Sequence, residues 1–183
     1  QATSSSMNST LICPSCGAQY PEDEVAWRCR CGSYLDLAFT PRFDPACLEG
    51  PECFLRYKSV LPLSFPEKAF TFGERFTPLH SMVFYGVPVW AKMDFLLTTG
   101  SFKDRGAFMM VNKCRELGIT RIVEDSSGNS ACAMAAYSAL AGIEAHIFMP
   151  RGNSSAKTVQ VRTYGATLHK IPGNRADCAR AAE

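Results

Sequence analysis

The chain has 183 residues, of which 46% are apolar and 20% are charged, and its formal net charge at pH 7 is +2. This composition is typical of one globular domain, alone or with a small module, and it excludes a disordered or fibrous protein. So small a net charge gives no support for a nucleic-acid or membrane surface. The longest uncharged run of the Ala-rich region, 131–143, is shorter than the ~20 residues of a membrane span.

The first ten residues, QATSSSMNST, lack the apolar core of a secretory signal. We therefore expect a disordered lead or a tag remnant there. Nine cysteines follow in the chain. In the absence of a secretory signal, reduced thiols are favoured over a disulfide framework, which predicts a cytoplasmic protein.

Residues 11–37 hold a cluster of cysteines in the pattern Cys-Pro-Ser-Cys, twelve residues, Cys-Arg-Cys: Cys13, Cys16, Cys29 and Cys31. Two such pairs can offer four thiolates to one tetrahedral Zn²⁺. The alternative is four ordinary thiols, two of them buried. We favour a zinc ribbon, because Gly17 and Gly32 directly follow two of the cysteines and let the backbone turn tightly around each pair.

A zinc ribbon can bind nucleic acid, or it can hold together a segment that has too little core of its own. The residues between the two cysteine pairs include Glu22, Asp23 and Glu24, and Asp36 lies just beyond the second pair. These carboxylates repel a phosphate backbone. We therefore expect a structural role for the metal and no nucleic-acid partner.

Residues 38–87 are rich in Phe and Pro, show little periodicity, and are expected to be an irregular part of the larger domain. From Val87 onward the pattern alternates between strands and helices. We expect strands at 87–94, 121–125, 144–149 and 166–171, and helices at 104–117, 131–141, 156–164 and from about Asn174 to the end. Glycine follows three of these helices, as is common at helix ends.

Strands that alternate with helices through short loops indicate βαβ units and a parallel sheet. The sequence therefore predicts an α/β domain over residues 88–183. Because the last expected helix runs to the final residue with no cap, we expect the chain to be the front part of a longer, truncated domain.

Lys103 stands in GSFKDRGAF (100–108), at the expected start of a helix. The positive end of the helix macrodipole disfavours a cation there and favours a neutral, nucleophilic amine. Lys103 is therefore either a solvated lysine of the first turn or an amine held for chemistry. The neighbouring Ser101 and Asp104 suit a helix start, so the lysine is the unusual residue.

A second polar loop, EDSSGNSA (124–131), follows a strand and precedes a helix. Loops at the carboxyl edge of a parallel sheet are where α/β proteins bind ligands, and a helix N-terminus suits a carboxylate or phosphate. A simple N-cap would explain one such residue, but five residues of this loop offer hydroxyls, a side-chain amide or free backbone N–H groups: Ser126, Ser127, Gly128, Asn129 and Ser130.

At these residues the chain resembles the fold-type II pyridoxal-phosphate enzymes, and among them threonine synthase and its relatives. The lysine motif GSFKDRG, the loop SSGNSA, the AGI at 141–143 and the pattern K-x-x-Q-x-x-x-YGA from Lys157 to Ala166 stand in the family's order. Several threonine synthase-like proteins also carry an N-terminal zinc ribbon. The resemblance covers residues 11–175 and implies an α/β parallel sheet.

The resemblance also implies roles for individual residues. Lys103 would form the Schiff base with the aldehyde of pyridoxal phosphate and act as the base. Asn129 would hydrogen-bond the ring hydroxyl of the cofactor, and Phe102 would pack near the ring. The substrate α-carboxylate would lie against four residues of the second loop: Ser126, Ser127, Gly128 and Ser130. The implied partner is a small amino-acid substrate, with a homodimer left open and no membrane.

The reaction implied by the resemblance converts O-phosphohomoserine and water into threonine and phosphate. Leu97 and Thr98 stand where threonine synthases commonly have Asn-Pro, which leaves the substrate open. The alternatives are a serine/threonine dehydratase, a cysteine synthase or a cysteate synthase. An alternative from another class is a zinc-ribbon binding module with a non-catalytic half-domain.

The family's glycine-rich phosphate loop and the residue that faces the pyridine nitrogen come later than these 183 residues. Gly152 and Gly173 are isolated and cannot replace that loop. A cofactor phosphate needs a nest of backbone N–H groups to replace its water. We therefore expect this segment alone to bind the cofactor weakly or not at all, and to be inactive.

Overall fold

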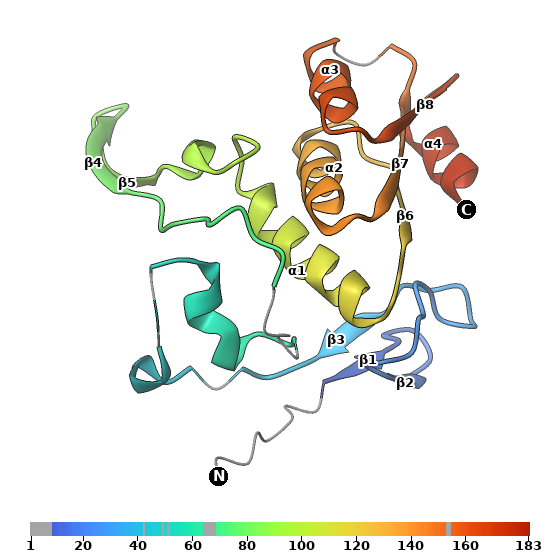
Figure 1. Cartoon of the computed structure of the whole chain (residues 1–183), viewed down its shortest axis with the longest axis horizontal. Coiled ribbons are helices and arrows are strands. Elements are labelled where there is room, and N and C mark those ends of the chain that lie inside the picture. The colour runs from blue at the N-terminus through green and yellow to red at the C-terminus, as the bar shows by residue number, and fades with distance from the viewer. Residues whose placement is uncertain (1–8, 42, 49, 51, 64–68, 153–154) are drawn as a thin grey trace.

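A three-stranded parallel sheet with helices on both faces forms the C-terminal part of the chain (Figure 1). The computed structural model describes residues 9–41, 43–48, 50, 52–63, 69–152 and 155–183. The strands β6 (Arg121–Glu124), β7 (Glu144–Pro150) and β8 (Thr167–Ile171) lie in the order β6-β7-β8, and both pairings are parallel. The parallel sheet expected from the sequence is confirmed.

Helices α2 (Asn129–Ala141) and α3 (Ser155–Thr163) cover one face of this sheet, and α4 (Arg175–Ala182) covers the other (Figure 1). The alternation of β7 explains the division, because its side chains point to opposite faces in turn. Ile147 and Met149 are fully buried in one cluster with residues of α2 and α3. Asn174 caps α4 by accepting bonds from two backbone N–H groups, as expected for a helix that starts there.

Helix α1 (Lys103–Glu116) packs on α2, on the side away from the sheet. Its apolar residues Ala107, Phe108 and Val111 recur at helical spacing and are at most 3% exposed. The helix ends before Gly118, whose φ of +69° lies in the left-handed region that favours glycine. Residues 103–182 therefore form four layers, with α2 buried between α1 and the sheet.

The composition of α2 suits this central position. Nine of its thirteen residues are buried, and five of those nine are alanines. Small side chains let α1 and the sheet approach α2 closely on opposite sides. Gly142, with φ of +65°, ends the helix and lets the chain turn directly into β7.

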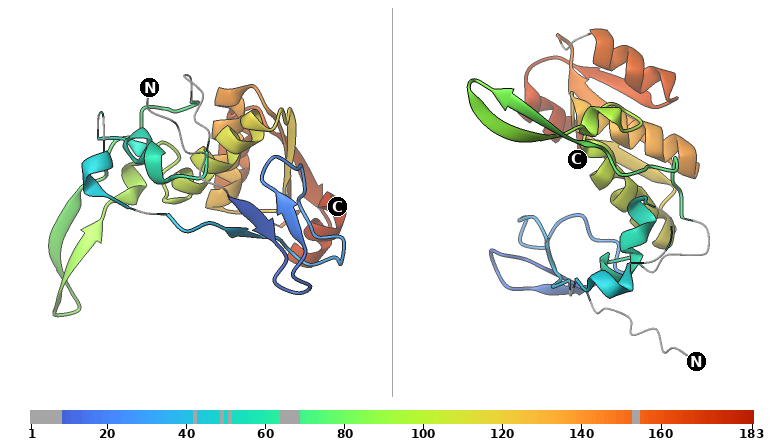
Figure 2. Two further views of the ribbon diagram at one scale, coloured as in Figure 1. Left: turned by 90° about the horizontal axis from the view of Figure 1, so that it is seen from below. Right: turned by 90° about the vertical axis from the view of Figure 1, so that its left-hand side faces the viewer.

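The strand expected at 87–94 exists, but it lies outside the parallel sheet. β5 (Val87–Lys92) pairs antiparallel with β4 (Leu79–Phe84), which falls within the segment expected to be irregular. The two residues between the strands, Tyr85 and Gly86, both have positive φ, which closes a tight antiparallel hairpin. Figure 2 shows this hairpin projecting from the rest of the molecule.

The N-terminal part is a separate antiparallel sheet of three short strands. They are β1 (Thr10–Ile12), β2 (Gln19–Pro21) and β3 (Asp36–Ala38), in the order β2-β1-β3. Cys13, Tyr20 and Cys29 form its small core. We call residues 9–38 the cysteine module.

Between the cysteine module and α1, the described residues include three 3₁₀ segments: η1 (Pro45–Cys47), η2 (Phe54–Val60) and η3 (Asp94–Leu96). Phe54 of η2 is buried, and its ring packs edge-on against the ring of Phe108 at 5.4 Å. This contact attaches the segment to α1. None of the described helices is both long and apolar enough to cross a bilayer.

Candidate functional site

Lys103 is the first residue of α1, at the end of a tight turn. The turn is made possible by Gly100, whose φ is +80°, and the backbone N–H of Lys103 donates to Ser101 Oγ at 3.3 Å. The side chain of Lys103 is exposed, and its Nζ lies 5.1 Å from the ring centre of Phe102, which is 58% exposed. The amine is therefore accessible and has an aromatic face beside it.

The buried carboxylate of Asp104 stabilises the turn before Lys103. Asp104 is fully buried and accepts hydrogen bonds from the backbone N–H of Thr99, at 2.8 Å, and from the Thr99 hydroxyl. Burial raises the pKa of Asp104, the bonds from Thr99 oppose this shift, and the nearby charge of Glu74 adds to it. Because Asp104 faces inward, Lys103 next to it faces outward.

The second predicted loop connects β6 to α2. Ser126 is buried, and its Oγ accepts a 3.4 Å bond from the N–H of Gly128, the N-cap residue of α2. Ser127 is half-buried, and the exposed Asn129 is the first residue of the helix. Ser130 Oγ donates to Glu124 Oε1 at 2.7 Å, so its hydroxyl points back to the strand rather than away from the loop.

Helix α3 connects these two loops. Lys157 Nζ donates to Asn129 Oδ1 at 2.6 Å, and Gln160 Nε2 donates to the carbonyl oxygen of Thr99 at 3.2 Å. In Figure 1, α1 and α2 begin at the same end of their layers. The structure thus places Lys103 and Asn129, which are 26 residues apart in sequence, at the starts of two packed helices on one side of the molecule.

The residues on this side offer side chains that suit an anionic aromatic cofactor. They include a primary amine, an exposed aromatic ring and a side-chain amide. Gly128, the N-cap residue of α2, has no side chain with which to cap the helix. A Cβ added to Gly128 would meet nothing within 4 Å, which shows open space in front of the loop. Pyridoxal phosphate fits this set.

The four predicted metal ligands also come together. The sulfur atoms of Cys13, Cys16, Cys29 and Cys31 all lie within 4.8 Å of one another. Two pairs are closer, with 3.5 Å between the sulfurs of Cys13 and Cys31 and 3.6 Å between those of Cys16 and Cys29. Four sulfurs about 2.3 Å from a tetrahedral Zn²⁺ are about 3.8 Å apart, so the cluster has a suitable size.

Cys29 is the best prepared of these thiols for metal binding. A hydrogen bond from the backbone of Cys31, and another from the hydroxyl of Tyr20 at 3.2 Å, lower its pKa to about 6. Both bonds stabilise the thiolate, which is the form that binds a metal. Tyr20 is buried, and its hydroxyl also accepts the N–H of Arg30 at 3.0 Å.

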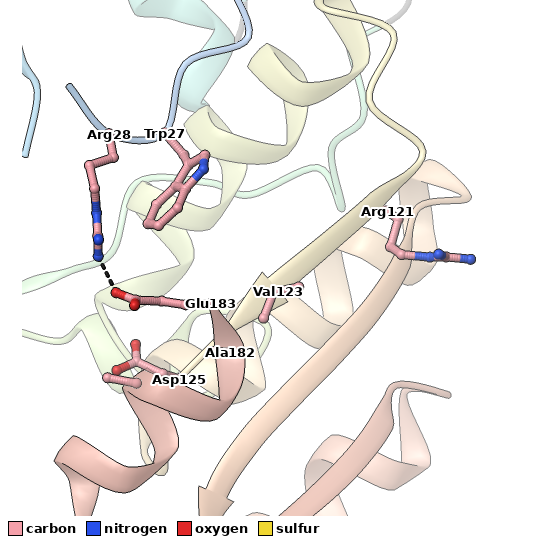
Figure 3. Close-up of a pocket in the computed structure, with 8 residues that line it drawn as sticks. Trp27, Arg28, Arg121, Val123, Asp125, Ala182 and Glu183 are labelled. Carbon is pink, nitrogen blue, oxygen red and sulfur yellow. Dashed lines mark hydrogen bonds and ion pairs between the residues drawn. The ribbon is translucent and has the colours of Figure 1, made fainter. Parts of the chain in front are cut away.

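A separate cavity of about 540 Å³ lies between the cysteine module and the face of β6 that α4 flanks (Figure 3). Trp27 and Arg28 line it from the cysteine module, and Arg28 forms an ion pair with Glu183. Val123 and Asp125 line it from the end of β6. None of the residues predicted to bind cofactor, substrate or metal lines this cavity, so we do not assign the chemistry to it.

Residues 70–183 match the family model of the pyridoxal-phosphate dependent enzymes. The matched region spans more than half of the chain and contains both loops described above. The chain therefore belongs to the pyridoxal-phosphate dependent enzyme family.

The relatives it resembles include threonine synthases. That of Methanosarcina acetivorans is 33% identical over 176 residues, which cover 90% of this chain and 43% of that protein. That of Halalkalibacterium halodurans is 38% identical, covering 64% of this chain and 35% of that protein. A solved pyridoxal 5′-phosphate-dependent aspartate racemase is similar with a TM-score of 0.53 and 29% identity, covering 58% and 36%. The chain spans less than half the length of these relatives.

Sequence reasoning gave no role to several residues around Lys103. Glu74 accepts hydrogen bonds from the hydroxyl of the fully buried Tyr137 and from the N–H of Phe72, at 3.1 Å for the latter. Lys157 and Gln160 belong to the pattern K-x-x-Q-x-x-x-YGA, which predicts no contact for either side chain. All these contacts join segments 28 or more residues apart, except the one to Phe72, so spacing along the chain gave no sign of them.

Proposed function

We propose that the protein is a pyridoxal-phosphate-dependent lyase of the threonine synthase type, which converts O-phosphohomoserine and water into threonine and phosphate. The observation that carries the proposal is the placement of Lys103 and Asn129 at the starts of two packed helices, linked by α3. The similarity to threonine synthases over 90% of the chain supports it.

Pyridoxal phosphate, when bound, supplies an electron sink for negative charge at the substrate Cα. Lys103 would hold the cofactor covalently through its amine and, once released, move the proton at Cα. The Asn129 amide would donate to the ring oxygen, and Phe102 would pack against the ring. The exposed position of Lys103 leaves its amine free to make this exchange.

The substrate carboxylate would bind at the start of α2. The backbone N–H of Ser130 and the hydroxyls of Ser126 and Ser127 are the donors we propose for it, and Gly128, whose N–H already donates to Ser126 Oγ, would leave room for the carboxylate. Their position is supported by the positive end of the helix macrodipole, which favours an anion there. Because the Ser130 hydroxyl already donates to Glu124, we assign its contribution to the backbone.

We also propose that Cys13, Cys16, Cys29 and Cys31 bind one structural Zn²⁺. The close sulfur atoms support this assignment. The metal would hold three strands that share a core of only three buried residues. A cytoplasmic location belongs to this proposal as well, and light scattering of the pure protein tests whether it forms a homodimer.

Leu97 differs from the residue common in threonine synthases, but the structure gives it a packing role. It is 6% exposed and belongs to the core between α1 and α2. Thr98 beside it is exposed. The difference at Leu97 is therefore compatible with the proposed substrate.

The experiment is a phosphate-release assay with O-phosphohomoserine, in a form of the protein that spans the full length of its relatives. We expect threonine and phosphate in equal amounts, and complete loss with Lys103→Ala. Lys113→Ala, on the same helix, is the control and should keep the activity. Release of ammonia and a keto acid from serine or threonine, without phosphate release, would instead identify a dehydratase.

A further inference from the structure

Lys157 and Gln160 lie one turn apart on α3 and reach the two loops of the proposed site. The ammonium of Lys157 is 2.6 Å from Asn129 Oδ1, and the amide of Gln160 is 3.2 Å from the carbonyl oxygen of Thr99. Residues three apart on a helix share a face. One face of α3 therefore contacts both the start of α2 and the turn before Lys103.

The position of this face is fixed by the packing of α3. Val161, four residues after Lys157, is fully buried in a cluster with Ala131 and Cys132 of α2 and with β7. Thr158 is also buried, and its hydroxyl lies 3.7 Å from the sulfur of Met149. Because Val161 and Thr158 pack α3 against α2 and the sheet, the position of Lys157 beside Asn129 is fixed.

The contact with Lys157 determines which end of the Asn129 amide is available. An asparagine side chain has an acceptor end, Oδ1, and a donor end, Nδ2, and rotation about χ2 exchanges them. An ammonium group has only donors, so it can bind only Oδ1. The Nδ2 donors are then directed away from Lys157 and are available to an acceptor on a ligand or in solvent.

We propose that Lys157 is a positioning residue that orients the Asn129 amide, so that Nδ2 donates to the ring oxygen of the cofactor. The inference rests on the proposed function, in which Asn129 contacts that oxygen. Without Lys157 the amide can turn and present Oδ1, which would repel the ring oxygen. Lys157 thus raises the fraction of molecules in which Asn129 Nδ2 is oriented to donate to the cofactor.

The first test follows the Asn129 side chain without any cofactor. Nitrogen-15 relaxation of its Nδ2 group, assigned with Asn129→Asp, reports how ordered the amide is. We expect an ordered amide in the wild type and in Lys157→Arg, which keeps donors and charge, and a mobile one in Lys157→Met. Lys170→Met on β8 removes the same charge elsewhere and should change nothing.

The second test measures the pyridoxal phosphate concentration that gives half-maximal borohydride-fixed label on Lys103. Lys157→Met should raise this concentration about 2- to 5-fold, as expected for loss of one charged contact at an exposed site. In an Asn129→Ala background the same substitution should have no further effect, because Lys157 acts through Asn129.

The outcomes separate this inference from the proposed function. If Lys103 is labelled selectively but Lys157→Met leaves the amide ordered, or weakens labelling equally with and without Asn129, the positioning role is overturned and the proposed function stands. If Lys103 is not labelled selectively in a form of the protein that spans the full length of its relatives, the proposed function itself fails. Amide exchange in β7 should be the same in all variants, which shows that they fold alike.

Discussion

Asp94 and Arg105 form a bidentate ion pair at the base of the hairpin, two residues from Lys103. Arg105 donates from Nη2 to Asp94 Oδ1 at 2.9 Å and from Nε to Oδ2 at 3.1 Å, and Thr77 Oγ1 donates to Oδ1 at 2.6 Å. These bonds, that from Arg105 above all, lower the pKa of Asp94 from 3.8 to about 2. The pair thus stabilises the fold above pH 4 and loses this effect as pH falls toward 2.

Asp94→Asn should therefore lower the free energy of unfolding by about 1–2 kcal/mol at pH 7, a range reduced for the partial exposure of Arg105. Near pH 2 wild type and variant should converge. Urea unfolding at the two pH values measures the difference. An equal loss at both would show that the carboxylate charge does not matter.

The sequence predicts where some functional residues lie, but it does not predict all of their contacts. Lys103 and Asn129 could be placed because glycines, serines and helical spacing mark where α1 and α2 begin. The contact between Asn129 and Lys157 could not, because it depends on how α3 docks on the sheet. Local signals fix where a side chain lies along the chain, whereas its partners depend on packing.

The hairpin of β4 and β5 packs little against the rest of the molecule. Val83, Tyr85 and Trp90 are 66%, 92% and 70% exposed, and an isolated two-stranded hairpin is marginally stable in water. Its backbone amides should exchange with solvent much faster than those of β7, whose alternate residues are buried. Hydrogen exchange followed by mass spectrometry measures both. Comparable protection in the two elements would show that another surface covers the hairpin.

The remaining elements show where sequence patterns are reliable. All helices and strands expected from residue 104 onward occur within two residues of their expected bounds. Glycines follow α1, α2 and α3, and an N-cap marks the start of α4, so these ends are signalled locally. The partner of β5 was missed because β4 lies among Phe- and Pro-rich residues. The domain boundaries at 37 and 88 remain predictions.

At the scale of the whole molecule, the cysteine module and the α/β part should unfold separately. The module has its own small core, and its described contacts with α4 include the exposed ion pair of Arg28 with Glu183. Such pairs contribute at most about 1 kcal/mol. Cys29→Ser should therefore remove bound zinc and expose the amides of 10–38, while those of 121–171 stay protected.

Metal analysis and hydrogen exchange of the same samples test this prediction. Wild type should contain one zinc per chain, as should Cys114→Ser, which changes a half-buried thiol of α1 outside the cluster. Zinc-free wild-type protein with a protected module would contradict the structural role. Loss of protection throughout the chain in Cys29→Ser would contradict separate unfolding.

The central claim is that Lys103 is the amine that holds the cofactor. The most direct measurement treats the chain with limiting pyridoxal phosphate, reduces it with borohydride and maps the labelled lysines by peptide mass spectrometry. The account predicts label on Lys103 in clear excess over Lys113 and Lys170, with the cofactor lost on gel filtration if reduction is omitted. Label spread evenly over exposed lysines, with none favoured at residue 103, would contradict the account.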